Sequence, residues 1–218
     1  PESFSASAFY YHHLKIAAEF AGLLGKQEDS ARYGRRLAAL KRNIQNTWHV
    51  RGTGRFDNAT QSAQLFALWY GLSPEKENSF KFLLQELGRH NWHLSTGIFS
   101  TAFFFDVMRE HNRNDIAYRV ANQRDYPGWG YMLDTGATTL WESWDFPHTS
   151  PSRNHPMFGS VDEWFYRSIL GINATSPGFA TTRIKPQPAG DLTWAKGGYN
   201  SVRGTFYSDW KKENNNFR

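Results

Sequence analysis

Apolar residues recur at intervals of three and four along most of the chain, which is the pattern of helices that bury one face. In the first such stretch Phe9 and Ile16 share a face, and Gly25 follows as a typical helix terminator. Further along, Ser73 and Pro74 predict an N-cap and a first helical residue. The pattern as a whole predicts seven helices, over residues 5–24, 28–48, 60–72, 74–88, 100–111, 114–124 and 161–171.

After Ile172 the pattern changes to short stretches of β-branched and aromatic residues separated by Gly, Pro and Asn. These stretches predict strands over 181–186, 192–196 and 202–207. Short and long connections alternate between the helices, which favours antiparallel helical hairpins. We therefore expect a mainly α protein with a helical domain over 1–174 and a β-rich module over 175–218. Three strands are few for a β domain, so we expect this module to be incomplete.

Composition adds aromatic richness and a dispersed positive charge. The chain has nine Trp, ten Tyr and 17 Phe. Sugar-binding clefts use such rings, because the apolar face of a pyranose packs on them. The net charge is +5, but the basic residues are spread along the chain, whereas nucleic-acid-binding proteins gather them on one face. We therefore expect no nucleic-acid partner.

Several further site classes are not expected. Without cysteine there are no disulfides or thiolate metal sites, and no apolar run approaches the roughly 20 residues of a membrane span. The adjacent His12 and His13 diverge on a helix, so we expect no metal and no cofactor. The sequence begins with Pro1 instead of an initiator Met, and a predicted helix follows directly. We therefore expect a longer native protein, and the compartment stays open between cytoplasmic, periplasmic and secreted.

The segment richest in candidate chemistry runs from Tyr126 to Trp164, a long connection between predicted helices that is rich in Gly, Pro and Trp. Loops on a rigid scaffold often carry function. Within this one, Glu142 stands between Trp141 and the Ser143-Trp144 pair. A carboxylate among apolar rings loses hydration, which suits it to general acid or base catalysis. The alternative, a surface Glu beside rings that point elsewhere, is equally compatible with composition alone.

Longer motifs carry a resemblance to a known family. Gly-Ala-Thr-Thr-Leu-Trp-Glu (136–142) and Asn-His-Pro-Met-Phe-Gly-Ser-Val-Asp-Glu-Trp-Phe (154–165) resemble the catalytic region of bacterial α-L-rhamnosidases of glycoside hydrolase family 78. The resemblance covers nearly the whole chain. It also includes Thr-Gln-Ser-Ala (60–63), His-Leu-Ser-Thr-Gly (93–97) and Gly-Asp-Leu-Thr-Trp-Ala (190–195).

This resemblance implies the C-terminal part of an (α/α)6 barrel followed by the start of a β-sandwich, and hydrolysis of terminal α-L-rhamnose with inversion. Glu142 is similar to the general base that activates water. The residues similar to sugar contacts of the family are His155, the aromatic walls Trp129 and Trp141, and the loop residues His93, Thr96 and Gly97.

One part of the family's machinery has no counterpart in this chain. An inverting glycosidase needs two carboxyl groups about 6.5–9.5 Å apart. In the family the general acid lies in an acidic motif before everything that this chain resembles, and the barrel has more helices than the predicted seven. We therefore expect a fragment that is nearly inactive alone and self-associates through the apolar side of an incomplete barrel. The alternatives are an inactive carbohydrate-binding or scaffold protein, and another helical-barrel glycosidase or lyase.

Overall fold

The computed structural model describes residues 2–145, 152–213 and 216–218. These residues form two compact units, Pro1–Thr96 and Gly97–Arg218.

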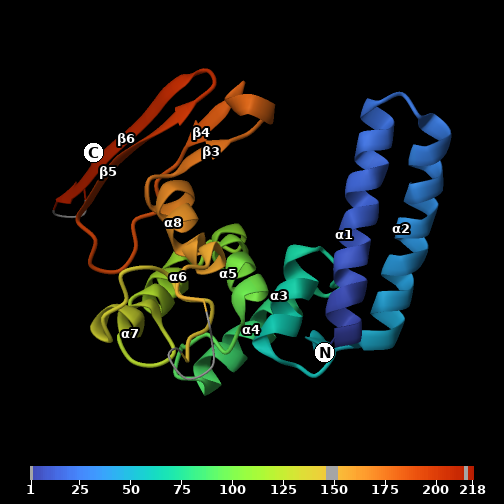
Figure 1. The fold of residues 1–218 in the computed structure, drawn as a ribbon, viewed down its shortest axis with the longest axis horizontal. Helices are drawn as coiled ribbons and strands as arrows, with labels where there is room; N and C mark the ends of the chain where they lie inside the picture. Colours follow the sequence, from blue (N-terminus) through green and yellow to red (C-terminus); the bar gives the residue numbers. More distant parts are fainter. Residues whose placement is uncertain (1, 146–151, 214–215) are drawn as a thin grey trace. The chain divides into compact units, whose positions relative to one another are not determined.

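The first unit consists of two helical hairpins joined by a small β-hairpin. The long helices α1 (Glu2–Leu23) and α2 (Gln27–Trp48) run side by side (Figure 1). The short strands β1 (His49–Val50) and β2 (Arg55–Phe56) pair antiparallel and lead to α3 (Gln61–Trp69) and α4 (Lys76–Arg89). The core is aliphatic and aromatic, and its fully buried members include Phe4, Ile44, Phe56, Leu65, Leu83 and Leu87.

The predicted start of α4 is wrong by two residues. The helix begins at Lys76, with Glu75 rather than Ser73 at its N-cap. The reason is that the Ser73 hydroxyl accepts a hydrogen bond from the Glu75 amide at 3.1 Å and shares another with the Ser79 hydroxyl at 2.7 Å. These bonds hold residues 73–75 in a turn that precedes the helix.

The second unit begins with helices and ends with strands. The helices are α5 (Ile98–Glu110), α6 (Asn114–Ala121), α7 (Trp129–Asp134) and α8 (Ser160–Trp164), with a 3-10 turn η1 (Pro156–Gly159) before α8. The predicted helix over 161–171 is α8 continued by a π-helical turn, η2 (Phe165–Ile169). The helix α7 was not predicted, because its six residues lie in a stretch rich in Gly and Pro.

The strands of this unit form two small antiparallel sheets. In one, β3 (Ile172–Ala174) pairs with β4 (Thr182–Ile184) around the 3-10 turn η3 (Pro177–Phe179). In the other, β5 (Trp194–Ser201) pairs with β6 (Gly204–Glu213), the hairpin drawn in red in Figure 1, and β6 pairs with β7 (Asn216–Phe217). Trp210 anchors this hairpin, since its buried indole donates to the Ile169 carbonyl at 2.8 Å.

The two long strands are the predicted strands over 192–196 and 202–207, extended in length, whereas β1, β2 and β3 were not predicted. None of the described helices combines the length and apolar character that crossing a bilayer requires.

A buried glutamine fixes the loop between α4 and α5. The Gln61 side chain is fully buried at the start of α3, donates to the His93 carbonyl at 3.0 Å and accepts from the Ser95 amide at 2.9 Å. Just before these two contacts, Asn91 and Trp92 have positive φ angles of 51° and 66°, which are unfavourable for residues other than glycine. The Gln61 amide therefore holds a strained loop by both of its polar groups.

We expect Gln61→Ala to destabilise the first unit and loosen this loop. The substitution leaves the His93 carbonyl and the Ser95 amide unpaired, at a cost of about 1–3 kcal/mol for each buried group. Thermal unfolding measures the loss, and hydrogen exchange of the Ser95 amide locates it. Gln27→Ala, at an exposed position in the same unit, is the matched control. Equal exchange of the Ser95 amide in the two variants would contradict the role given to Gln61.

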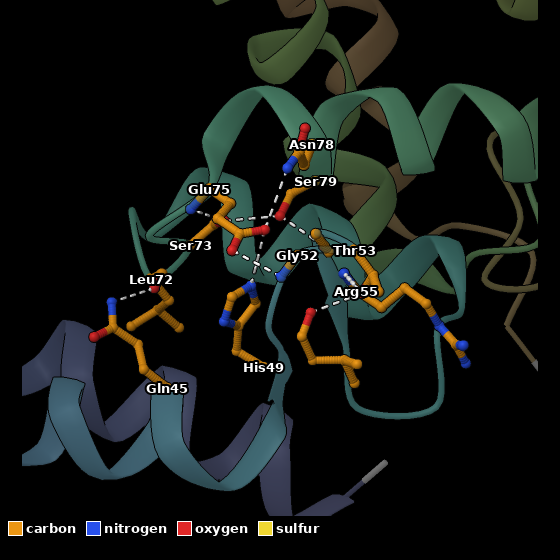
Figure 2. A network of polar contacts seen from close by, with 12 residues as sticks. Gln45, His49, Gly52, Thr53, Arg55, Leu72, Ser73, Glu75, Asn78 and Ser79 are labelled. Atoms are coloured by element: carbon orange, nitrogen blue, oxygen red, sulfur yellow. Dashed lines mark hydrogen bonds and ion pairs between the residues drawn. The ribbon is translucent and has the colours of Figure 1, made fainter.

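The β-hairpin of the first unit is held by a second polar network, centred on Glu75 (Figure 2). One carboxylate oxygen accepts from the Gly52 amide at 2.9 Å. The other accepts from the Asn78 side chain at 3.3 Å and lies 3.7 Å from Nε2 of the buried His49. The hydrogen bond from Gly52, followed by that from Asn78 and the nearby His49, lowers the pKa of the Glu75 carboxyl below its ordinary value.

This shift predicts a loss of stability in acid. Because the pKa of Glu75 is lower in the folded than in the unfolded chain, its contribution is complete above the ordinary value of 4.5. The contribution disappears as the pH falls through the folded pKa. We expect Glu75→Gln to flatten the pH dependence of the unfolding midpoint in this acidic range.

The exposed Glu77 lies on the same helix outside the network, so Glu77→Gln is the control and should keep the wild-type pH profile. If the Glu75→Gln profile matched that of wild type below pH 4.5, the network would make no such contribution.

Candidate functional site

Two segments of the second unit lie side by side and carry the predicted residues Trp141, Glu142 and His155. The His155 amide donates to the Leu140 carbonyl at 2.9 Å, and the Glu142 amide donates to the Ser152 carbonyl at 3.3 Å. The Thr139 hydroxyl donates to the Arg153 carbonyl. These bonds pair 139–142 with 152–155, so Glu142 and His155 lie on adjoining stretches of backbone, although 13 positions separate them in the sequence.

An aromatic cluster supports this pair of segments. Trp144 stacks on Phe158 with ring centroids 3.9 Å apart, and Trp129 meets Trp144 edge-on at 5.0 Å. The Trp129 indole also donates to the Phe158 carbonyl at 2.9 Å. Behind them, Phe105 of α5 lies between Trp129 at 5.6 Å and Trp164 at 5.3 Å. The cluster ties Trp144 and Phe158, which follow the two segments in the chain, to α5, α7 and α8.

Glu142 lies between two buried tryptophans. Trp141 and Trp144 are buried, at 5% and 7% exposure, while Glu142 between them is half-buried. The two buried rings therefore anchor the segment on both sides of Glu142. A carboxylate on an anchored segment meets one need of a catalytic base, because it is held in place.

His155 caps the 3-10 turn that follows it. Its Nδ1 atom accepts a hydrogen bond from the Met157 amide at 3.4 Å. A neutral imidazole that accepts at Nδ1 carries its proton on Nε2. The half-buried ring therefore has Nε2–H as its hydrogen-bond donor, which suits an acceptor oxygen such as that of a sugar hydroxyl.

Trp129 also lines a cavity of about 530 Å³. Besides Trp129, its wall includes Met132, Leu140, Val161, Trp164 and Phe165. Glu142, Trp141 and His155 are not among its lining residues. The cavity is therefore a largely apolar space that borders the 139–142 segment at Thr139 and Leu140, and Trp129 is the predicted site residue that lines it.

The remaining predicted residues belong to the loop before α5. His93 and Thr96 are buried members of the first unit, and the Nδ1 atom of His93 lies 3.2 Å from the His90 carbonyl. Gly97 is the first residue of the second unit and the N-cap of α5, where its carbonyl accepts from the Thr101 hydroxyl at 2.9 Å. Gln61, which holds the 93–95 stretch, was not predicted as a site residue. The sequence signal that could have identified Gln61 is a glutamine among apolar residues at the start of a predicted helix.

The site as described contains no metal-binding group. Across residues 2–145, 152–213 and 216–218, no three His, Asp or Glu side chains are grouped so as to hold an ion. Asp145, close to Glu142 in the chain, affects the pKa of the Tyr126 hydroxyl. Partial burial, followed by the charge of Asp145, raises the pKa of the Tyr126 hydroxyl.

Comparison with protein families gives two adjoining matches that together cover the chain. Residues 1–169 match the bacterial alpha-L-rhamnosidase six-hairpin glycosidase domain, and residues 171–218 match the bacterial alpha-L-rhamnosidase C-terminal domain. The predicted mainly α fold, with part of a six-hairpin domain followed by C-terminal strands, is confirmed.

Individual relatives agree with these matches. An alpha-L-rhamnosidase of Streptomyces avermitilis is 33% identical over the whole chain, and one of Formosa agariphila is 32% identical over 97% of it. These alignments cover only 22% and 24% of the relatives' own lengths.

Solved structures show the same relation. The crystal structure of the Streptomyces avermitilis alpha-L-rhamnosidase complexed with L-rhamnose superposes with a TM-score of 0.92 at 32% identity, over 100% of this chain and 22% of that one. The alpha-L-rhamnosidase from Dictyoglumus thermophilum superposes with a TM-score of 0.87 at 35% identity, over 95% of this chain and 24% of that one. The sequence motifs, the hairpins of helices and these matches agree, and the chain belongs to the bacterial α-L-rhamnosidase family.

Proposed function

We propose that this chain supplies the catalytic base of an enzyme that hydrolyses terminal α-L-rhamnosides with inversion, and that Glu142 is that base. The observation that carries the proposal is the placement of Glu142. This half-buried residue lies between two buried tryptophans, on a segment that is hydrogen-bonded to the segment of His155. The names of the relatives, alpha-L-rhamnosidases, supply the substrate class.

In this mechanism Glu142 removes a proton from a water molecule as that water attacks the anomeric carbon on the face opposite the leaving oxygen. A general acid on the other side of the sugar protonates that oxygen. Since the chain spans about a quarter of the length of its curated relatives, we place this acid in a part of the enzyme outside these 218 residues. The isolated chain then lacks one of the two carboxyl groups that the reaction needs.

The other predicted residues bind and orient the sugar in this proposal. His155 donates from Nε2 to a sugar hydroxyl, because its Nδ1 is occupied by the Met157 amide. Trp129 and Trp141 form the aromatic wall against which the apolar face of the pyranose packs. The family resemblance also assigns sugar contacts to His93, Thr96 and Gly97, in a loop whose shape is set by Gln61.

We also propose that the helical part self-associates when it is separated from the rest of the enzyme. The end of α1 and the residue after it expose Phe20, Leu23 and Leu24, at 59%, 82% and 71%. Exposed large apolar side chains favour contact between copies in water.

The central test is Glu142→Gln in the full-length enzyme that contains this chain. The substitution preserves the size of the side chain and removes the base, so kcat on an aryl α-L-rhamnoside should fall by roughly 10²–10⁴-fold while KM changes little. Azide, which needs no base, should restore part of the turnover and give a glycosyl azide of inverted configuration.

Glu163→Gln is the matched control, since Glu163 is an exposed carboxylate on α8 that pairs with Arg167 at 2.7 Å. It should keep the wild-type kcat. An unchanged kcat in Glu142→Gln would remove the central residue of the proposal. Hydrolysis at full rate by the isolated 218-residue chain would show that the general acid lies within it.

A further inference from the structure

The first unit contains a polar cavity that the proposed hydrolysis does not use. It measures about 390 Å³ and opens where the β-hairpin, the start of α3 and the end of α4 meet. The side chains that line it and could bind a ligand are Arg55, Asn58, Thr60, Phe82, Arg89 and Ser95. Hydroxyl and amide groups, an aromatic ring and guanidinium groups therefore surround one space.

Its charge is positive and only partly compensated. Arg89 pairs with Glu86, one turn earlier on α4, and this carboxylate also lines the cavity. The Arg55 guanidinium, in contrast, lies 5.7 Å from the centre of the Phe82 ring and, within the described part of the chain, pairs with no carboxylate. A guanidinium that rests on an aromatic ring is oriented without being neutralised. Arg55 is therefore a fixed cation that is available to a ligand.

The backbone that carries Arg55 is held rigidly. The Ser79 hydroxyl donates to the Gly54 carbonyl at 2.7 Å, and the Arg55 amide donates to the Thr53 hydroxyl at 3.1 Å. At Gly54 a Cβ atom would lie 2.3 Å from the backbone of α4, so the hairpin is pressed closely against that helix. Figure 2 shows the Arg55 side chain extending away from the Glu75 network that holds the same hairpin. The Arg55 guanidinium therefore extends outward from a rigidly held backbone.

The loop that follows Arg55 also lines the cavity, and it is strained. Asp57 and Ala59 have positive φ angles of 47° and 65°, although neither is glycine. Asn58 lies between these two residues and Thr60 follows them. The Thr60 hydroxyl donates a hydrogen bond to the Asn58 side-chain oxygen at 3.0 Å. Backbone strain of this kind is concentrated at ligand sites, where the surrounding structure enforces it. Here it turns Asn58 and Thr60 toward the same space as Arg55.

We propose that this cavity binds a sugar that carries a carboxylate, a uronate. The Arg55 guanidinium pairs with the carboxylate, since its planar fork matches that group in two parallel hydrogen bonds. Asn58, Thr60 and Ser95 exchange hydrogen bonds with the hydroxyls, and Phe82 contributes the apolar contact. Every residue of this site lies in the first unit. The proposal therefore does not depend on Glu142 being the catalytic base. It predicts that a uronate binds even where no glycoside is hydrolysed.

The test compares two ligands that differ only at C6. The ¹⁵N-labelled 218-residue chain is titrated with D-glucuronate and with D-glucose, and shifts of the Asn58 and Ser95 amides and of the Arg55 Nε–H are followed. We expect saturable shifts at these positions with D-glucuronate, weakened by salt, and no saturable shifts with D-glucose. Arg55→Gln should weaken D-glucuronate binding about tenfold, which is the effect of losing one charge-assisted pair.

Two further variants make the test specific. Arg55→Lys keeps the charge without the fork, so it should bind more weakly than wild type and more tightly than Arg55→Gln. Arg35→Gln removes an exposed arginine from α2 in the same unit and should bind as wild type does.

Inorganic phosphate is the third probe. If phosphate produced the same shifts at the same concentrations as D-glucuronate, the cavity would be a plain anion site and the sugar assignment would be wrong. Absence of D-glucuronate binding, or equal losses in Arg55→Gln and Arg35→Gln, would overturn the proposal.

Discussion

The proposed active site depends on one constraint, the backbone pairing of residues 139–142 with residues 152–155. Glu142 and His155 lie in an irregular stretch, in which none of the described residues 139–145 and 152–155 belongs to a helix or strand. The pairing alone does not fix it in space. That is done by the stacked Trp144 and Phe158 and by the hydrogen bond from Trp129, which attach both segments to the helices around them. The aromatic content that first suggested a sugar-binding protein therefore also has a structural purpose, which is to hold an irregular segment in one conformation.

The first unit shows the same principle with polar groups. Gln61 holds the 93–95 loop through both ends of its amide, and Glu75 holds the β-hairpin through the Gly52 amide. In both places a side chain from a helical hairpin forms hydrogen bonds with backbone groups of a loop. These backbone groups lie outside the regular hydrogen-bonding pattern of the helices and strands. Loops held in this way keep their shape when a ligand binds, which reduces the entropic cost of binding. Both loops carry residues to which a ligand contact is assigned here.

Much of the helical architecture could be predicted from the sequence, because periodic burial is a local signal. The long helices α1 and α2 match the predicted ranges 5–24 and 28–48 to within three residues, and the predicted range over 114–124 has the same start as α6. The misses have physical causes. The hydrogen bond between the Ser73 and Ser79 hydroxyls holds Ser73 outside α4, so the helix begins later than predicted. The short helix α7 lies in a Gly- and Pro-rich stretch. The site residues Glu142 and His155 followed from family resemblance. The bonds that bring them together were not predictable, because they join backbone groups 10 or more positions apart and so leave no periodic trace.

The central claim is that Glu142 and His155 share one sugar-binding pocket, and a crystal structure of the full-length enzyme with bound L-rhamnose tests it most directly. The account predicts the Glu142 carboxylate on one side of the anomeric carbon, with a water molecule between them, and His155 Nε2 within hydrogen-bond distance of a sugar hydroxyl. A separation of more than about 15 Å between the Glu142 carboxylate and the His155 ring would contradict it, because a pocket for a single sugar cannot span that distance.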